Sequence, residues 1–322
     1  MASVILGGAA AVGADPRAGM VRIPGGAFVM GSDRHYPEEA PAHPVQVDAF
    51  LMDRTTVTNA DFAAFVAATG YRTVAERPLD PARYPGARPE LLEPGSLVFR
   101  MSQGPVDLAD YRNWWHWTPG ACWKHPEGPH SAILGRLDHP VVHVAYADVK
   151  AYARWAGKDL PTEAEWEFAA RGGLEAAEFA WGDALLPGGK YLANFWQGAF
   201  PFRNDALDGF SGTAPVASYP ANAYGLHDMI GNVWEWTSDW FATRHQAPAP
   251  SPCCVPENPR GAAIEGSFDL AQPAIRIPRK VLKGGSFLCA ENYCRRYRPA
   301  SRHAQMVDSG MSHVGFRCVL RD

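Results

Sequence analysis

The spacing of hydrophobic residues predicts three short helices, over residues 58–69, 148–156 and 162–171. In the first, apolar residues return every three to four positions, as one buried helical face requires. A threonine precedes this run and a glycine follows it, and both residue types are favoured at those helix ends. The third helix opens with a capping box, in which Thr162 and Glu165 can each bond the other's backbone N–H.

Extended segments are predicted to be short. Residues 21–57 have the pattern of strands and turns, and residues 45–47 alternate as a half-buried strand does. Residues 141–145 are predicted to be extended. From residue 174 onward we expect only short strands and loops, with residues 242–280 irregular because they are rich in proline.

Residues 71–135 are dense in Pro, Gly and Trp and have no clear period. We expect an ordered surface excursion here, of the kind that shapes a binding site. With no internal repeat and no clear linker, the chain is predicted to be one α+β domain with little regular structure. Its expected bounds are residues 20–322, after a flexible tail at residues 1–19.

Composition narrows the class of protein. The 322 residues are 47% hydrophobic and include 11 Trp, 31 Gly and 28 Pro, which favours loops and short strands around aromatic anchors. The net charge is −4 and there is no basic run, so no nucleic-acid partner is expected. No apolar stretch approaches the roughly 20 residues that span a bilayer, so no membrane partner is expected either. Six irregularly spaced cysteines favour a reducing, cytoplasmic location, and we expect a monomer.

The most informative local feature is the pair Cys289 and Cys294, among aromatic residues and arginines and just after Gly284-Gly285. Five residues of regular helix or strand would point the two side chains apart. If the sulfurs act together, the backbone must bend between them. Such a pair can close a disulfide, bind a soft metal, or act as a nucleophile with a resolving partner. The spacing leaves these three open.

Other cysteines and histidines are expected to be structural. His139 and His143 flank a proline and valines, which argues against a helical metal pair. Cys253 and Cys254 are adjacent and are expected to be ordinary loop thiols, and Cys318 a small buried apolar residue.

Oxygen-bearing side chains recur in loop-like stretches beside Gly and aromatic residues. Such loops bind hard cations such as Ca²⁺, with backbone carbonyls as further ligands. The alternative is that the same side chains cap turns. The residues concerned are Asn194, Asp208, Asp228 and Glu235.

The chain resembles the formylglycine-generating enzymes of the sulfatase-modifying-factor family, from about residue 20 to residue 321. Most of the matching blocks mark the wider fold family, whereas the Cys-x₄-Cys in its Tyr-Cys-x-x-Tyr-Arg context is specific to the oxidase. The blocks are Ile23-Pro24-Gly25-Gly26, Met30-Gly31, Thr56-Val57-Thr58-Asn59, His139 to Val144, Leu160 to Glu167, Ala193 to Gly198, Gly231 to Trp236, and Lys283 to Ser286.

This resemblance implies a C-type-lectin-like fold and a copper-dependent oxidase. It implies that Cys289 and Cys294 hold Cu(I) between two thiolates in near-linear geometry, which suits a soft ion. A cysteine of a sulfatase-type Cys-x-Pro-x-Arg motif would add as a third thiolate, and O₂ would react at the copper. Loss of hydrogen from the substrate Cβ would give a thioaldehyde that hydrolyses to Cα-formylglycine.

Further roles are implied position by position. Ser286, Tyr293 and Trp234 match residues that line the oxygen and thiol pocket, and Arg298 matches a pocket arginine. Two structural Ca²⁺ sites are also implied. The first comprises Asn194, Asp208 and the carbonyls of Phe195 and Phe210, and the second Asp228, Glu235 and the carbonyls of Gly231 and Val233.

The chain departs from the family pattern near the expected substrate groove. His313 stands where a pocket asparagine is usual, and the segment 242–280 is longer than usual. Partner cysteines of the family's structural disulfides fall here at Ala153, Ala170 and Pro299, so those bridges are not expected. Residues 254–258 resemble the substrate motif, with Asn for Arg, and could occupy the peptide groove of this or a neighbouring chain.

Three functions therefore compete. The first is oxidation of a cysteine in a partner protein to formylglycine with Cu(I) and O₂. The second keeps the copper chemistry but acts on a different thiol. The third is a non-catalytic lectin-like binding module that retains the two cysteines by descent.

Overall fold

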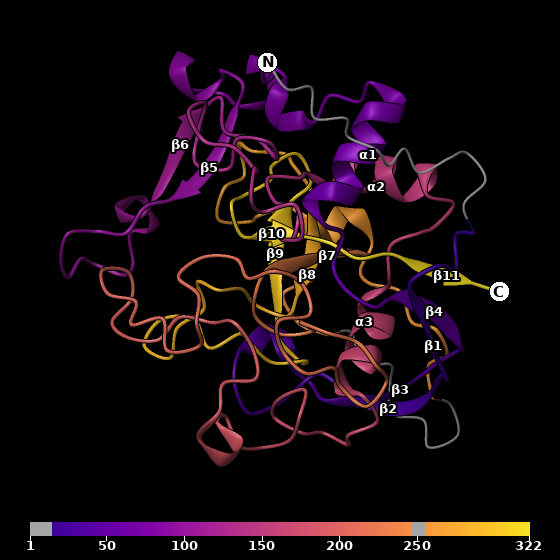
Figure 1. Cartoon of the computed structure of the whole chain (residues 1–322). Helices are drawn as coiled ribbons and strands as arrows, with labels where there is room; N and C mark the ends of the chain where they lie inside the picture. Colours follow the sequence, from indigo (N-terminus) through magenta and orange to yellow (C-terminus); the bar gives the residue numbers. More distant parts are fainter. Residues whose placement is uncertain (1–14, 246–254) are drawn as a thin grey trace, which may run out of the picture.

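The computed structural model describes residues 15–245 and 255–322. Its helices are α1 (Asn59–Thr69), α2 (Tyr146–Trp155) and α3 (Glu163–Arg171), which confirms the three predicted from spacing (Figure 1). The capping box at Thr162 forms as expected, and Thr58 caps α1 as expected, in a second capping box with Asp61. Helix α2 begins two residues earlier than predicted, because Asp148 accepts a hydrogen bond from the Ala145 N–H and caps the first turn.

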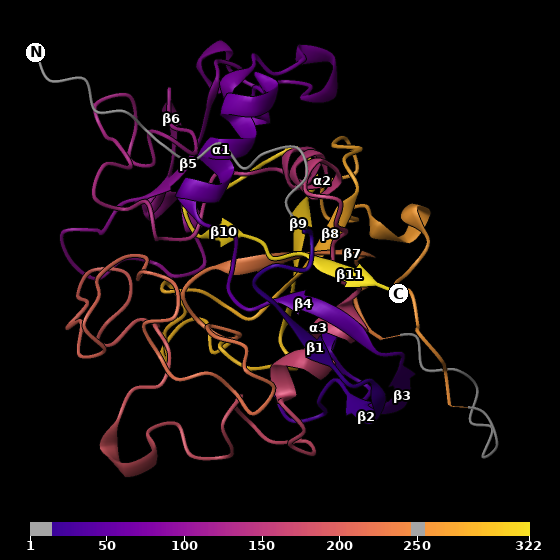
Figure 2. The same ribbon diagram turned by 45° about the vertical axis from the view of Figure 1, so that its right-hand side comes forward.

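Short strands form four small sheets in the described residues (Figures 1 and 2). The central sheet has the order β10 (Val314–Gly315), β7 (Trp234–Trp240), β8 (Arg279–Lys283) and β9 (Arg302–Met306). A second sheet has the order β1 (Met20–Ile23), β4 (Phe50–Asp53) and β11 (Val319–Arg321). Two hairpins complete the set: β2 (Gly26–Met30) with β3 (His43–Val47), and β5 (Gly95–Phe99) with β6 (Trp115–Pro119).

Single 3₁₀ turns punctuate the connections. They are η1 (Pro37–Glu39), η2 (Val74–Glu76), η3 (Pro81–Arg83), η4 (Pro89–Leu91), η5 (Tyr111–Asn113), η6 (Pro187–Gly189) and η7 (Ile264–Ser267). No helix in the described ranges is both long enough and apolar enough to cross a membrane.

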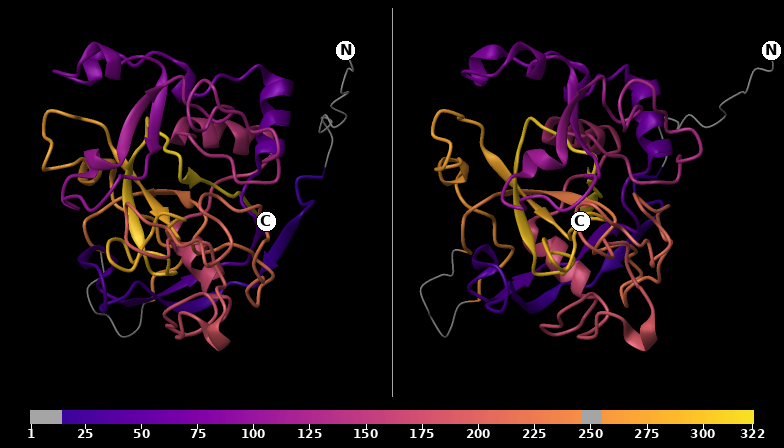
Figure 3. Two further views of the ribbon diagram at one scale, coloured as in Figure 1. Left: turned by 60° about the vertical axis from the view of Figure 1, so that its left-hand side comes forward. Right: turned by 90° about the vertical axis from the view of Figure 1, so that its left-hand side faces the viewer.

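Two local features differ from expectation. The surface excursion expected at residues 71–135 contains the β5–β6 hairpin, which the sequence pattern did not predict and which stands at the opposite end of the molecule from β1–β4 (Figures 1 and 3). Residues 141–145 form no strand, because His143 adopts a φ of 60° and turns the chain. Their backbone instead bonds to two separate segments, through the carbonyls of Val57 and Met311.

Helix α3 lies at the centre of the main core. All nine of its residues are buried, and it packs against β2, β3, β7 and β8. A smaller aromatic cluster lies apart from this core and joins the β5–β6 hairpin to the segment that carries the two cysteines. Its buried members are Trp114, Trp196, Phe200, Phe287, Leu288 and Ala290.

Buried ion pairs tie the C-terminal third of the chain to earlier elements. The Arg298 guanidinium pairs with both carboxylate oxygens of Glu39, and each side chain is almost wholly buried. Comparable buried pairs join Arg302 to Glu163, Lys283 to Glu167, and Arg317 to Glu235.

His139, His143 and Cys318 take structural positions, as expected. His143 is fully buried, with Nδ1 2.8 Å from the Ser96 hydroxyl and Nε2 2.8 Å from the Pro126 carbonyl. His139 contacts the Thr213 hydroxyl at 2.9 Å, and Cys318 is fully buried. Cys253 and Cys254 lie outside the described residues.

Replacing Glu39 with Gln is expected to destabilise the protein strongly. The change leaves the Arg298 guanidinium buried without its counter-charge, which costs about 3 kcal/mol in comparable cases. The urea midpoint should fall accordingly. Glu90→Gln is the matched control, because the Arg88–Glu90 pair is exposed and 4.0 Å apart. Equal midpoints for the two variants would refute a special role for the Glu39 pair.

Acid should destabilise the fold through His143. Burial lowers its pKa to about 4, whereas an unfolded histidine titrates near 6.5. Between these values the unfolded chain binds a proton that the folded chain does not, so stability falls as pH drops below about 6.5. The stability difference between wild type and His143→Gln should shrink by roughly 1.4 kcal/mol per pH unit in this range. A difference that stays constant from pH 7 to 4.5 would contradict this assignment.

Candidate active site

A tight turn brings the two cysteines together. The Cys294 N–H donates to the Ala290 carbonyl at 2.8 Å, which closes one helical turn between them. The Cys289 N–H donates to the Ser286 carbonyl at 2.9 Å, and the Trp196 N–H donates to the Cys289 carbonyl at 3.0 Å. The backbone therefore bends as the sequence requires if both sulfurs are to act at one place.

Glycine is required just before this turn. Gly285 has a φ of 73°, and a Cβ at this position would lie 2.7 Å from the Arg296 carbonyl oxygen. The two sides of the cysteine segment can therefore approach each other only where the first side carries no side chain.

The Cys289 and Cys294 sulfurs lie 3.2 Å apart. A disulfide would place them at about 2.0 Å, so both are free thiols. The thiol of Cys289 and the nearby Arg296 cation lower the pKa of Cys294, while burial raises the pKa of Cys289. Two sulfurs this close are a soft donor set of the kind that Cu(I) prefers.

Arg296 links the thiols to the N-terminal part of the chain. Its guanidinium lies 3.8 Å from the Cys294 sulfur and donates to Glu38 at 2.6 Å. The same guanidinium stacks 3.7 Å from the centre of the Tyr36 ring. The Tyr36 hydroxyl also accepts a hydrogen bond from the Arg295 N–H at 3.0 Å. The Arg296 cation beside Cys294 is thus held by the Glu38 carboxylate and by the Tyr36 ring.

The thiols lie in the wall of a cavity of about 200 Å³, far above the roughly 10–15 Å³ that one water needs. Four other predicted site residues line it: Trp234, Ser286, Tyr293 and His313. Arg298 does not, and its prediction as a pocket arginine is corrected here. Its guanidinium is turned away and committed to Glu39, and its Nε donates to the Arg295 carbonyl.

Several cavity residues were not predicted individually. Trp114 and Trp115 come from the hairpin region that was expected only in general terms to shape a site. Leu288 and Arg296 belong to the cysteine segment itself but were not singled out. Phe200, His303, Gln305 and Met311 come from segments that gave no local signal, because their neighbours in space are remote in sequence.

His313 packs its ring 4.7 Å from that of Trp115 and is only 8% exposed. Its Nδ1 is buried and has no hydrogen-bond partner. Burial lowers the pKa of this imidazole to about 3, so the ring is neutral at cellular pH. His313, which stands where the family usually has an asparagine, therefore puts a neutral aromatic ring in the cavity wall.

The first group of predicted calcium ligands is brought together only in part. Asn194 has a buried Oδ1 that lacks a hydrogen-bond partner within the described residues, as a cation ligand would. However, the Gln197 amide donates to both the Phe195 carbonyl and the Asp208 carboxylate. The Phe210 N–H donates to the same carboxylate at 3.1 Å. The Asn194 oxygen is therefore free to bind a hard cation, whereas the Phe195 carbonyl and the Asp208 carboxylate already accept hydrogen bonds.

The second group of predicted calcium ligands is also brought together only in part. Asp228 has a buried Oδ1 that receives no hydrogen bond from the part of the chain that the structure describes. Glu235 accepts hydrogen bonds from the Arg317 guanidinium through both oxygens, and from the Trp166 indole N–H. The Oε1 atom of Glu235 accepts only one of these hydrogen bonds, so one of its lone pairs remains free. Gly231 and Val233 lie in the same buried turn before β7.

The segment that resembles a substrate motif does not line the cavity where it is described. The Pro256 carbonyl accepts a hydrogen bond from Gln46, and the Asn258 N–H donates to the Gln46 carbonyl. Residues 256–258 therefore run beside β3 of the same chain. Cys254 itself lies outside the described residues.

Comparisons with known proteins show the family of this chain. The chain is 57% identical to the formylglycine-generating enzyme of Mycobacterium tuberculosis, over 93% of this chain and 97% of the relative. It is 45% identical to the formylglycine-generating enzyme of Mus musculus, over 93% of this chain and 74% of the relative. Among solved structures, PvdO from Pseudomonas aeruginosa has a TM-score of 0.60 at 24% identity, over 94% of each chain, and shows the same fold.

The family assignment rests on nearly the whole length of the chain. Residues 9–322 match the family described as sulfatase-modifying factor enzyme 1-like domain. The predicted α+β, C-type-lectin-like fold and the predicted family are both confirmed. The chain belongs to the sulfatase-modifying-factor family.

Proposed function

We propose that this protein converts a cysteine of a protein or peptide substrate into Cα-formylglycine. The relatives that match almost the full chain carry the name of this activity. The observation that carries the proposal is the pair of free thiols, 3.2 Å apart, in the wall of a cavity. The finer part of the proposal is that Cys289 and Cys294 hold Cu(I) and that O₂ is the oxidant.

The residues around the thiols have separate roles in this proposal. Bound copper would supply the one-electron chemistry that lets O₂ react with a thiol. The Ser286 N–H lies 3.4 Å from the Cys289 sulfur and orients it. The Arg296 cation offsets negative charge on Cys294, which favours the thiolate that a soft metal requires.

The aromatic wall has a different role. Tyr293 stacks 4.6 Å from the Phe200 ring, and Trp114 packs edge-on against both. These rings exclude bulk water from one side of the cavity and leave room for a substrate side chain. Exclusion of water protects a reactive sulfur–carbon intermediate until its hydrolysis.

Two other functions remain to be separated from this one. A copper oxidase acting on a different thiol would bind metal but leave a sulfatase-type peptide unchanged. A non-catalytic binding module would neither bind the metal nor convert the peptide. The two free thiols favour an enzyme, because a binding module gains nothing from keeping two reduced sulfurs in contact.

The direct test is the incubation of copper-loaded protein with a Cys-x-Pro-x-Arg peptide in air. Mass spectrometry should detect formylglycine in this peptide and no change in a peptide with Ser for Cys. Cys289→Ala and Cys294→Ala should each lower the rate by at least about a thousandfold, because each removes half of the metal site. Cys122→Ala is the matched control, since this cysteine is buried away from the cavity.

Anaerobic titration with Cu(I) provides the second readout. The tightest binding should disappear in both active-site variants and persist in Cys122→Ala. Copper binding without peptide conversion would favour the different-thiol oxidase. The absence of both would leave the binding module.

Calcium is proposed as a structural ion. The unpartnered oxygens of Asn194 and Asp228 support it, since buried polar atoms without partners are uncommon and hard cations prefer oxygen. Addition of the calcium chelator EGTA should lower the thermal unfolding midpoint, and excess Ca²⁺ should restore it. Asn194→Ala and Asp228→Ala should each reduce the response. An unchanged midpoint in EGTA would rule calcium out as a stabilising ligand.

A further inference from the structure

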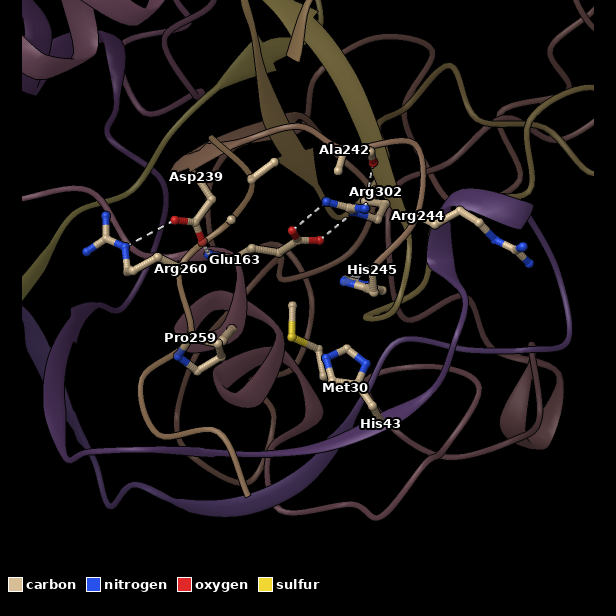
Figure 4. A pocket seen from close by; sticks show the side chains of 13 residues that line it. Met30, His43, Glu163, Asp239, Ala242, Arg244, His245, Pro259, Arg260 and Arg302 are labelled. Carbon is tan, nitrogen blue, oxygen red and sulfur yellow. Dashed lines mark hydrogen bonds and ion pairs between the residues drawn. The ribbon is translucent and has the colours of Figure 1, made fainter. Parts of the chain in front are cut away.

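A second cavity lies across strand β9 from the thiol cavity. Arg302 lines this second cavity and the next residue, His303, lines the thiol cavity, because successive strand residues face opposite sides. The second cavity is small, at about 60 Å³, which is enough for an ion and its immediate shell. Figure 4 shows Met30, His43 and His245 gathered on one side of it, away from the Asp239–Arg260 pair.

Strand pairing places the first two of these side chains together. Met30 and His43 are direct partners in the β2–β3 hairpin, so they project from the same face. The His43 Nδ1 lies 2.8 Å from the Pro41 carbonyl. A carbonyl can only accept, so Nδ1 must carry the proton, and Nε2 keeps its lone pair. A backbone carbonyl on the distal nitrogen is the usual support of a metal-binding histidine.

His245 approaches from the segment after β7. Its N–H donates to the Ala40 carbonyl at 2.9 Å, which fixes the backbone beside η1. Its Nε2 is buried and has no hydrogen-bond partner among residues 15–245 and 255–322. The ring fits because residue 31 is glycine: a Cβ there would lie 3.1–3.3 Å from the Cδ2 and Nε2 atoms of His245.

The spacing of the two rings suits a shared ion. Their centres lie 5.0 Å apart. Two imidazoles bound at about 2.0–2.1 Å to one tetrahedral or trigonal ion would have centres about 5 to 6 Å apart. Plain ring packing also occurs at this spacing, so the unpartnered Nε2 and the fixed His43 proton are the observations that favour a ligand.

The charges around the cavity select the kind of ion. The Glu163 carboxylate is committed to the Arg302 guanidinium through both oxygens. Asp239 accepts from the Glu163 N–H and from Arg260. No carboxylate among the lining residues is therefore left to neutralise a divalent ion. Two imidazole nitrogens and a thioether sulfur are instead a neutral, soft donor set, which favours a singly charged soft metal.

We propose that Met30, His43 and His245 bind one Cu(I) ion at a site separate from the Cys289–Cys294 pair. The site lies beyond the proposed catalytic reaction and does not depend on it. Its ligands would be the Met30 sulfur and the imidazole nitrogens of the two histidines.

The test uses the full chain with Cys289→Ser and Cys294→Ser, so that the thiol site is absent. Anaerobic Cu(I) titration against a chromogenic chelator should still give about one bound equivalent. His43→Ala and His245→Ala should each weaken this binding by at least about tenfold. Met30→Leu keeps the side-chain volume and should weaken it as well. X-ray absorption of the bound copper should show nitrogen neighbours and one sulfur.

His125→Ala is the matched control, because this half-buried histidine also contacts a carbonyl but lies outside the cavity. It should leave the affinity unchanged, and far-UV circular dichroism should show that every variant is folded. No Cu(I) binding in the double-serine background, or binding that survives His245→Ala, would overturn the proposal and leave ring packing as the role of the pair. Peptide conversion by the wild-type protein is unaffected by either result, so the two proposals fail independently.

Discussion

Buried arginine–glutamate pairs determine where the cysteine segment lies. Arg298 and Arg302 follow the thiols within a few residues, and their partners Glu39 and Glu163 belong to elements far earlier in the chain. A buried charge without its partner is costly, so each pair strongly disfavours any other placement of the segment. Such pairs are a poor source of net stability compared with apolar packing. Their value here is to fix position, and that position brings the cavity walls together.

Arginine–glutamate pairing also determines which charge lies beside the two sulfurs. Glu38 and Glu39 are neighbours in η1, yet they hold arginines with different tasks. The Glu39 pair is fully buried and fixes the backbone, whereas the Glu38 pair leaves a guanidinium against the Cys294 sulfur. One short turn of the N-terminal segment therefore supports both the geometry and the charge of the thiol pair.

Much of the fold could be predicted from sequence because the signals are local. The three helices follow from caps and apolar spacing, and the bend between the cysteines follows from their separation. The walls of the site could not be predicted in this way. Trp115 and His313 meet only because β5 pairs with the segment at Met311, and Arg298 turns inward only because Glu39 is there. These outcomes depend on contacts between residues that are remote in sequence.

Strand β9 forms a partition between the two cavities, and residues of this strand line both of them. His303 and Gln305 face the chamber with the thiols, while Arg302 faces the other. Attempts to broaden the range of accepted substrates can therefore vary every second position of this strand. A change at Arg302 would release the carboxylate of Glu163 from its partner and disturb the reverse side of the wall.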